Sequence, residues 1–469
     1  MSNILKIFLI FFLITGCSFH KNSTFWSNEK IVEESQEQQK DIIEIFEKEE
    51  AMNNEFNPSL KINLKSKIID KSLIKNFNKN NDERINFNGM LNKVSKFKFK
   101  KIKNFHQYEH EITFNKDNII FFDNNGSILN FDNKSNLLWK KNYYSKSEKK
   151  QNPALFFAHD NNHLIVADSI AKLYALNINT GELLWSKLNK APFNSQIKVY
   201  KDNFYIIDFE NTIRAYSLKD GKEIWKNKTQ DSFIRSNKKL SLVIVEEKIY
   251  FNNSLGDISA IDINTGDLIW QTPTQNNLEY DSGFFLKTSD IVADQETLFF
   301  SNNKNEFFSL NMLSGNINWK QKINSNLRPS IINNFIFTIS LEGYLIVIEK
   351  NSGNIIRSTD LFSKFIKKKG KIAFLSDKKM NPLYAFNKKV RSDNKNSSGP
   401  VRPEFKPTGF IIGKNNIYLS TDHGRLFIIN TTTGTTETVI KLHNSKISRP
   451  SVINKNLYVI AENTIIKLD

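Results

Sequence analysis

Residues 173–185 read LYALNINTGELLW, and three more stretches repeat this pattern: IRAYSLKDGKEIW at 213–225, ISAIDINTGDLIW at 258–270 and FFSLNMLSGNINW at 307–319. Each copy has an Asp, Asn or Ser ahead of a Thr, Ser or Asp joined to Gly, and a Trp four residues after that Gly. An apolar strand precedes each copy, for example HLIVA at 163–167. The repeated unit is therefore strand, turn, strand, glycine turn, and a strand that contains Trp.

The spacing of the repeat glycines indicates the architecture. Gly181, Gly221, Gly266, Gly315 and Gly353 are 40, 45, 49 and 38 residues apart. Four short strands with their turns need about this length, so each unit predicts one blade of a β-propeller. Weaker copies at 119–139, 335–357 and 417–438, and a last copy at 456–469 that stops before its final strand, raise the count to eight.

The fold class is therefore predicted as all-β, an eight-bladed β-propeller over residues 93–469. Ser95–Lys100 alternates polar and aromatic residues, and we expect it to supply the missing last strand and close the ring. Glycine adopts a positive φ at low cost, which explains Gly181, Gly221, Gly266 and Gly315 in the turns. The repeated tryptophans are expected to pack between neighbouring blades as structural residues: Trp139, Trp185, Trp225, Trp270 and Trp319.

One region breaks the period, because Gly353 and Gly434 are 81 residues apart. Residues 360–406 are interpreted as an insertion that carries a small hairpin, with a degenerate ninth repeat as the alternative. The insertion is favoured because no glycine turn of the repeat type follows Phe386. Long insertions in compact folds are often functional.

The N-terminus has the order of a secretory signal peptide over residues 1–16, with a charged Lys6 and an apolar run at 7–14 that is too short to span a bilayer. Ile14-Thr15-Gly16-Cys17 resembles the bacterial lipobox, so the sole cysteine, Cys17, is expected to carry lipid. Residues 17–92 lack a strand repeat and are predicted to be a charged tether, partly disordered, with an acidic part at 29–50 and a basic part at 61–103.

The charge balance points to acidic partners but not to nucleic acid. Lys and Arg number 66 against 49 Asp and Glu, a net charge of +17. The chain lacks an RNA-binding aromatic motif, and its export signal removes it from cytoplasmic nucleic acid. A single cysteine excludes an intramolecular disulfide and a cysteine-based zinc site.

The lipobox followed by eight such units resembles the family of the outer-membrane β-barrel assembly lipoprotein B, whose repeats are of the pyrroloquinoline-quinone (PQQ) type. The resemblance implies a non-enzymatic scaffold, lipid-anchored on the periplasmic face of the outer membrane. Its implied partners are the POTRA domains of the barrel-assembly pore protein, the accessory lipoproteins of that pore and outer-membrane protein clients. The family's contact loop corresponds to Ser232-Phe233-Ile234-Arg235, and a second, weaker correspondence falls on Asp290. The implied partner-binding residues are thus Phe233, Ile234, Arg235 and Asp290.

Two other functions compete with this interpretation. A PQQ-dependent dehydrogenase needs calcium held by carboxylate and amide oxygens beside the quinone, and an Asp base, whereas the acids of this chain are scattered. No cofactor and no metal are predicted; His106 and His110, four residues apart, are interpreted as surface histidines. The other alternative is a propeller whose basic tether and insertion bind anionic lipid, lipopolysaccharide or peptidoglycan.

Overall fold

The computed structural model describes residues 51–64, 68, 80–81, 84–229, 238–275, 286–365 and 405–469. These residues belong to one compact unit, which spans 51–469. The predicted signal peptide, Cys17 and the acidic part of the tether lie outside the described residues.

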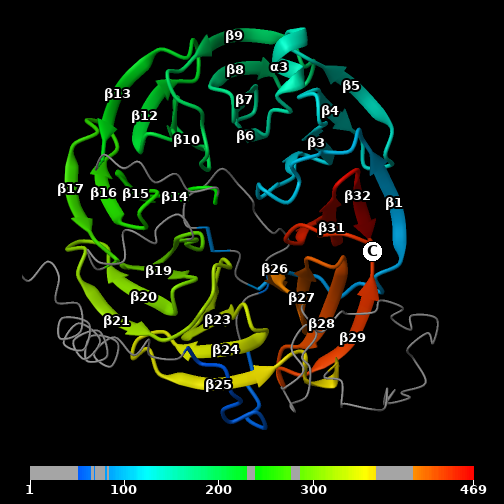
Figure 1. Cartoon of the computed structure of the whole chain (residues 1–469), viewed down its shortest axis with the longest axis vertical. Coiled ribbons are helices and arrows are strands. Elements are labelled where there is room, and N and C mark those ends of the chain that lie inside the picture. The colour runs from blue at the N-terminus through cyan, green and yellow to red at the C-terminus, as the bar shows by residue number, and fades with distance from the viewer. Residues whose placement is uncertain are drawn as a thin grey trace, which may run out of the picture. The chain divides into compact units, whose positions relative to one another are not determined.

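The described strands form eight four-stranded antiparallel sheets, which follow one another around a ring as blades (Figure 1). Blade one contains β2 (Thr113–Asn115), β3 (Asn118–Phe122), β4 (Ile128–Phe131) and β5 (Leu137–Lys141), and blade two contains β6 (Leu155–His159), β7 (His163–Asp168), β8 (Lys172–Asn177) and β9 (Leu183–Leu188). Blade three contains β10 (Lys198–Tyr200), β11 (Asn203–Ile207), β12 (Thr212–Ser217) and β13 (Glu223–Lys228), and blade four contains β14 (Leu242–Val245), β15 (Lys248–Asn252), β16 (Ile258–Asp262) and β17 (Leu268–Thr272). Blade five contains β18 (Val292–Asp294), β19 (Thr297–Asn302), β20 (Glu306–Asn311) and β21 (Ile317–Gln321), and blade six contains β22 (Ser330–Ile332), β23 (Phe335–Ile339), β24 (Tyr344–Glu349) and β25 (Ile355–Asp360). Blade seven contains β26 (Pro407–Ile412), β27 (Asn416–Thr421), β28 (Arg425–Asn430) and β29 (Thr436–Lys441), and blade eight contains β30 (Ser451–Ile453), β31 (Asn456–Ala461), β32 (Thr464–Leu468) and β1 (Lys93–Lys98).

The middle strands of each blade are short apolar runs because neighbouring blades cover both faces of the sheet. In blade two, β7 is buried from Leu164 to Asp168 and β8 from Leu173 to Leu176. The outer strand β9 instead leaves Leu183 and Leu184 exposed. Continuous apolar runs of this length are typical of strands buried on both faces, and they place the core between the blades.

The ring closes where the sequence predicts. Strand β1 pairs antiparallel with β32, with Phe97 opposite Ile465, and completes the sheet of β30, β31 and β32. The segment at the start of the propeller therefore supplies the outer strand of the last blade. This pairing confirms the predicted closing strand and the count of eight blades, and it leaves no blade with a missing strand.

The repeat tryptophans lie at the seams between blades. The Trp185 indole N–H donates to the Leu218 carbonyl of blade three at 3.0 Å, and its ring lies on Gly221, whose φ is +66°. A Cβ on Gly221 would lie 2.7 Å from that ring, so this glycine is needed for both its turn and its lack of a side chain. Equivalent bonds join the next three seams: Trp225 to Ile263, Trp270 to Met312 and Trp319 to Lys350. Trp139 lies in the same way against Gly181.

At the seam between blades six and seven, Arg357 stands in the tryptophan position. It is fully buried, and its guanidinium donates to the carbonyls of Thr432 at 2.5 Å and Leu60 at 3.0 Å. It lies against Gly434 as the tryptophans lie against their glycines. Burial lowers the pKa of Arg357 to about 10, and the backbone carbonyls supply the negative ends of the dipoles around its charge.

The residues that Arg357 binds include part of the predicted tether. Residues 51–64, which we call the N-terminal strap, run over blades six and seven. Phe56 forms an antiparallel bridge with Ser358 of β25, and the Ile62 N–H donates to the Thr432 carbonyl at 3.0 Å. The sequence predicts an irregular tether as far as residue 92, whereas the structure packs the strap onto the propeller.

Blades six and seven contact each other directly through Arg357, so the stretch 361–406 connects two adjacent blades. Most of the predicted insertion, residues 366–404, lies outside the described residues. Two short helices occur in the described connections: α3 (Lys146–Lys150) and the 3₁₀ turn η2 (Ser363–Phe365). In the described part of the chain, no helix has the length and apolar character that crossing a membrane requires.

Candidate functional site

One face of the ring carries the described ends of the connections between blades. Because each blade is an antiparallel meander, the link from its outer strand to the next inner strand leaves on the same side every time. We call this side the loop face; the described parts of its connections are 99–112, 142–154, 189–197, 229, 238–241, 273–275, 286–291, 322–329, 361–365, 405–406 and 442–450. Of the predicted contact residues, Asp290 lies on this face, in the connection that precedes blade five.

The described residues on both flanks of the predicted contact loop are hydrogen-bonded to the propeller. Phe233, Ile234 and Arg235 lie outside the described residues. On one flank, the Thr229 N–H donates to the Asn211 carbonyl at 3.1 Å. On the other flank, the Lys238 carbonyl accepts from the Asn194 side chain at 3.0 Å.

Asp290 is buried, with 5% of its surface exposed, and Arg328 binds its carboxylate. The Arg328 Nε lies 2.5 Å from Asp290 Oδ2. Burial alone would raise the pKa of Asp290, but the positive charges of Arg328, Lys238 and Lys239 outweigh it and hold the pKa well below its usual range. Asp290 is thus an ionised carboxylate that holds the loop-face connections together from within.

Asp290 belongs to a larger set of charges that sequence reasoning missed. Lys239 pairs with Glu111 at 2.7 Å, Arg328 bridges Glu111 and Asp290, and Lys238 pairs with Glu109. We call this set, together with Lys198, the axial network; it consists of Glu109, Glu111, Lys198, Lys238, Lys239, Asp290 and Arg328. It joins four connections of the loop face to β10 of blade three.

The axial network nearly balances its own charge. Burial would raise the pKa of Glu111, but Lys239 and Arg328 reverse that effect and lower it to about 2. Burial lowers the pKa of Lys198 to about 7, and the nearby Arg328 charge acts in the same direction. The network therefore sets three carboxylates, Glu109, Glu111 and Asp290, against four basic side chains, and one of these, Lys198, has its pKa lowered toward neutrality. Such a network fixes shape, because removing one member leaves another charge buried without a partner.

Asn80, from the predicted tether, occupies the axis beside this network. It accepts from Lys198 Nζ at 2.6 Å, and its amide donates to the Ile291 carbonyl at 2.9 Å and to Gln196 at 3.1 Å. The next residue, Asn81, bonds to Ile331 of blade six in both directions. The cavity left here is about 50 Å³, far below the roughly 300–1,000 Å³ of pockets that hold small molecules.

Of the two histidines in the connection 99–112, one agrees with the prediction of a surface position and the other does not. His106 is exposed, but His110 is 8% exposed and stacks on Phe105 with ring centroids 4.8 Å apart. Burial, with smaller effects from Lys446 and Lys239, lowers the pKa of His110 to about 3, so the ring is neutral. The prediction of two surface histidines is therefore wrong for His110, whose apolar surroundings make it a core residue. Within the described ranges, no three His, Cys, Asp or Glu side chains gather as metal ligands would.

The sequence feature that could have predicted the axial network is weak. Its members lie just before the inner strands, as in Glu109-His110-Glu111 ahead of β2, Lys238-Lys239 ahead of β14 and Arg328 ahead of β22. Charged residues beside an apolar strand are common at surfaces. Only the ring geometry brings these connections together around one axis.

Comparisons with known proteins agree with this geometry. Residues 124–359, just over half of the chain, match the family described as outer membrane protein assembly factor BamB. A relative with that name from Kangiella koreensis is 27% identical over 120 residues, which cover 23% of this chain and 28% of the relative. This chain thus matches under a third of that relative's length.

Two solved structures share the fold. The crystal structure of BamB from Moraxella catarrhalis has a TM-score of 0.58 at 13% identity, and the match covers 81% of this chain and 100% of that one. The quinohemoprotein alcohol dehydrogenase from Comamonas testosteroni has a TM-score of 0.59 at 11% identity, with 82% and 78% covered. At such identities these likenesses show the propeller fold alone.

Proposed function

Because the chain belongs to the family of the outer membrane protein assembly factor BamB, we propose that it is a non-enzymatic scaffold of outer-membrane β-barrel assembly. It would bind POTRA domains of the barrel-assembly pore protein, work beside the accessory lipoproteins of that pore and assist the folding and insertion of barrel clients. Lipid on Cys17 would hold it at the periplasmic face of the outer membrane. The family match over residues 124–359 is the observation that carries the proposal.

The loop face supports a docking role. We propose that Phe233, Ile234 and Arg235 contact the partner directly, because one flank of their loop is bonded to the turn between β11 and β12 and the other to the connection 189–197. Asp290 would support partner binding indirectly, because its buried carboxylate binds Arg328 within the axial network and holds the connections in place. A loop on a rigid base loses less conformational entropy on binding than a free one, which favours affinity.

A scaffold also suits the axis of the ring better than an enzyme. The axis beside the loop face is filled by Asn80, which binds Gln196 at 3.1 Å and Lys198 at 2.6 Å. Their hydrogen bonds are mutually satisfied, and the space that remains is about 50 Å³. We therefore place the binding surface on the outside of the loop face.

The test is a pull-down of the tagged full chain from gently solubilised membranes, with mass spectrometry of the co-purifying proteins. We expect recovery of the POTRA-bearing pore protein by the wild type. Arg235→Glu should abolish recovery. Lys219→Glu, at an exposed lysine in the turn between β12 and β13 on the opposite face, is the matched control and should keep it.

The same pull-down separates the parts of the proposal. Absence of every barrel-assembly component from the wild-type sample would contradict the assembly role. Equal recovery with Arg235→Glu would retain the role and reject this loop as the contact. Release of a Cys17→Ala variant into the soluble fraction is expected if lipid on Cys17 is the anchor, and retention of that variant in the membrane would reject it.

A further inference from the structure

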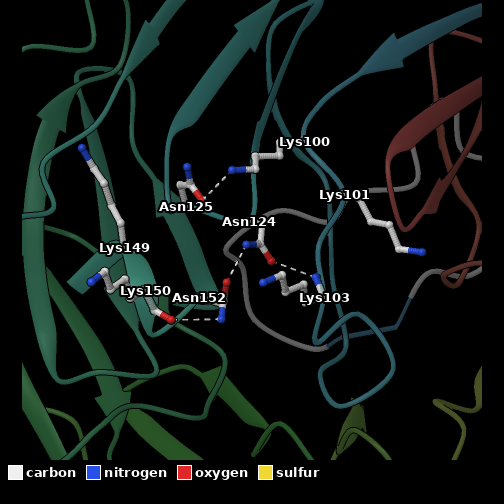
Figure 2. A pocket seen from close by; sticks show the side chains of 8 residues that line it. All are labelled: Lys100, Lys101, Lys103, Asn124, Asn125, Lys149, Lys150 and Asn152. Carbon is white, nitrogen blue, oxygen red and sulfur yellow. Dashed lines mark hydrogen bonds between the residues drawn. The ribbon is translucent and has the colours of Figure 1, made fainter. Parts of the chain in front are cut away.

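A second feature of the loop face lies at blades one and two, away from the predicted contact loop. Five lysines and three asparagines line a pocket there of about 530 Å³ (Figure 2). They come from three segments: the connection 99–112, the turn between β3 and β4, and the connection 142–154. We call it the lysine pocket; its lining residues are Lys100, Lys101, Lys103, Asn124, Asn125, Lys149, Lys150 and Asn152.

The lysine pocket holds more positive charge than its surroundings balance. Lys101 pairs with Glu462 at 2.9 Å. Among the described residues, no carboxylate lies within ion-pair distance of the other four lysines: Lys100, Lys103, Lys149 and Lys150. The pocket thus gathers four lysines that have no carboxylate partner in the described part of the chain.

The nearest carboxylates on the same segments are engaged elsewhere. Asp123 accepts from the backbone N–H groups of its own turn and from Lys140 at 2.9 Å. Glu148 accepts from the Ser145 N–H in the capping box of α3 and pairs with Lys172 at 3.2 Å. Both acids are therefore bound by backbone N–H groups and by a lysine that does not line the pocket, Lys140 for Asp123 and Lys172 for Glu148.

Hydrogen bonds fix the asparagines between the two groups of lysines. Asn124 accepts from the Lys103 backbone N–H at 2.8 Å and donates to Asn152 at 2.5 Å. Asn125 accepts from Lys100 Nζ at 3.2 Å. Figure 2 shows these amides in the middle, with Lys149 and Lys150 on one side and Lys100, Lys101 and Lys103 on the other. The asparagines of the pocket are thus held in place by their own hydrogen bonds.

We propose that the lysine pocket binds a ligand that carries two or more phosphate groups. Lysine ammonium groups are common phosphate-binding point charges, and four of them match a polyanion better than a single carboxylate. The volume of the pocket lies within the roughly 300–1,000 Å³ of small-molecule sites. A phosphate-bearing ligand would also relieve the mutual repulsion of the lysines. This inference does not depend on the proposed assembly role.

The test measures binding of inorganic pyrophosphate to the full-length protein by isothermal titration calorimetry at low salt. We expect wild-type protein to bind one pyrophosphate. A triple Lys→Gln variant of Lys103, Lys149 and Lys150 should bind at least tenfold more weakly. The matched control is a triple Lys→Gln variant of Lys187, Lys219 and Lys222, which are exposed in β9 and in the turn that follows β12; it should stay within twofold of the wild type. Unchanged melting temperatures will show that both variants fold.

A parallel arm identifies the source of the phosphate. Co-sedimentation with phosphatidylcholine vesicles, with and without cardiolipin, whose headgroup carries two phosphates, compares the same three proteins. A difference between wild type and pocket variant only on anionic vesicles assigns a lipid headgroup, and one only with pyrophosphate assigns a soluble phosphate ligand. Failure of the wild type to bind either probe overturns the proposal. Equal weakening in the pocket and control variants also overturns it, because binding would then follow net charge alone.

Discussion

The axial network and the lysine pocket lie on the same face and are both rich in lysine, yet they differ in what surrounds each charge. In the axial network Lys238 and Lys239 are nearly buried, and each meets a carboxylate. In the lysine pocket Lys103 and Lys150 are exposed, and their positive charge has no carboxylate partner among the described residues. A lysine that pairs with a buried carboxylate stabilises the fold, whereas a lysine without such a partner is available to a ligand. The number of lysines alone does not distinguish the two cases.

The largest expected effect comes from breaking the axial network. Arg328→Met leaves Asp290 without its main partner in a buried site and should lower the free energy of unfolding by about 3–5 kcal/mol. Urea unfolding followed by tryptophan fluorescence measures it. Lys320→Met, which breaks the exposed pair with Glu306, is the matched control and should cost less than about 1 kcal/mol.

A second substitution separates lost pairing from lost packing at this site. If unpaired charge is the cause, Asp290→Asn in the Arg328→Met background should recover part of the lost stability. Equal losses in the free energy of unfolding for Arg328→Met and Lys320→Met would show that the axial network does not hold the connections together. The proposed difference from the lysine pocket would then be wrong.

Arg357 extends the comparison to a buried cation that is balanced by carbonyl dipoles. Arg357→Met removes its bonds to Leu60 and Thr432 and leaves these carbonyls without that donor, at a cost of about 1–3 kcal/mol. Because Leu60 lies in the N-terminal strap, the strap should also detach more often. Limited proteolysis with mapping of the cut sites should show faster cleavage within residues 51–64, and an unchanged rate there would contradict the anchoring role of Arg357.

The pH dependence of stability gives a smaller effect with a definite sign. The pKa of Glu111 is about 2 in the folded protein against an ordinary value of 4.5. The unfolded chain therefore binds more protons, and the stabilisation by Glu111 is present above about pH 4.5 and is lost as the pH falls toward 2. Urea midpoints between pH 7 and 3 should fall less steeply for Glu111→Gln than for the wild type. Parallel curves would show that Glu111 is not held ionised by Lys239 and Arg328.

Much of the ring could be predicted from the sequence because its signals are local. The spacing from Gly181 to Trp185 recurs in each strong copy, and the alternation around Phe97 identifies the closing strand that pairs with β32. These features are set within one blade or at one seam. The middle strands of a blade are buried on both faces, so they must consist of consecutive apolar residues. Such runs can be recognised directly in the sequence.

The strap and the axial network could not be predicted, because they depend on contacts between segments that are far apart in the sequence. Met52 and Ile62 bind the propeller through backbone N–H groups and pack their side chains into its core, but they are isolated apolar residues outside any repeat, and no period marks them in the sequence. Glu109, Lys238 and Arg328 come from separate connections, and only the closed ring makes them neighbours. The contact role of Phe233, Ile234 and Arg235 stays a prediction, to be decided by the Arg235→Glu pull-down.

The smallest expected effect sharpens the comparison most. The triple Lys→Gln variant of Lys103, Lys149 and Lys150 should change the free energy of unfolding by no more than about 0.5 kcal/mol, because exposed charges without pairs contribute little to stability. At low salt the variant should be slightly more stable than the wild type, since like charges are removed, and added salt should erase that difference by screening. Urea unfolding at two ionic strengths measures both. A loss of more than about 2 kcal/mol would mean that these lysines hold the fold as the axial network does, and the division of the loop face into structural and ligand-facing charge would be wrong.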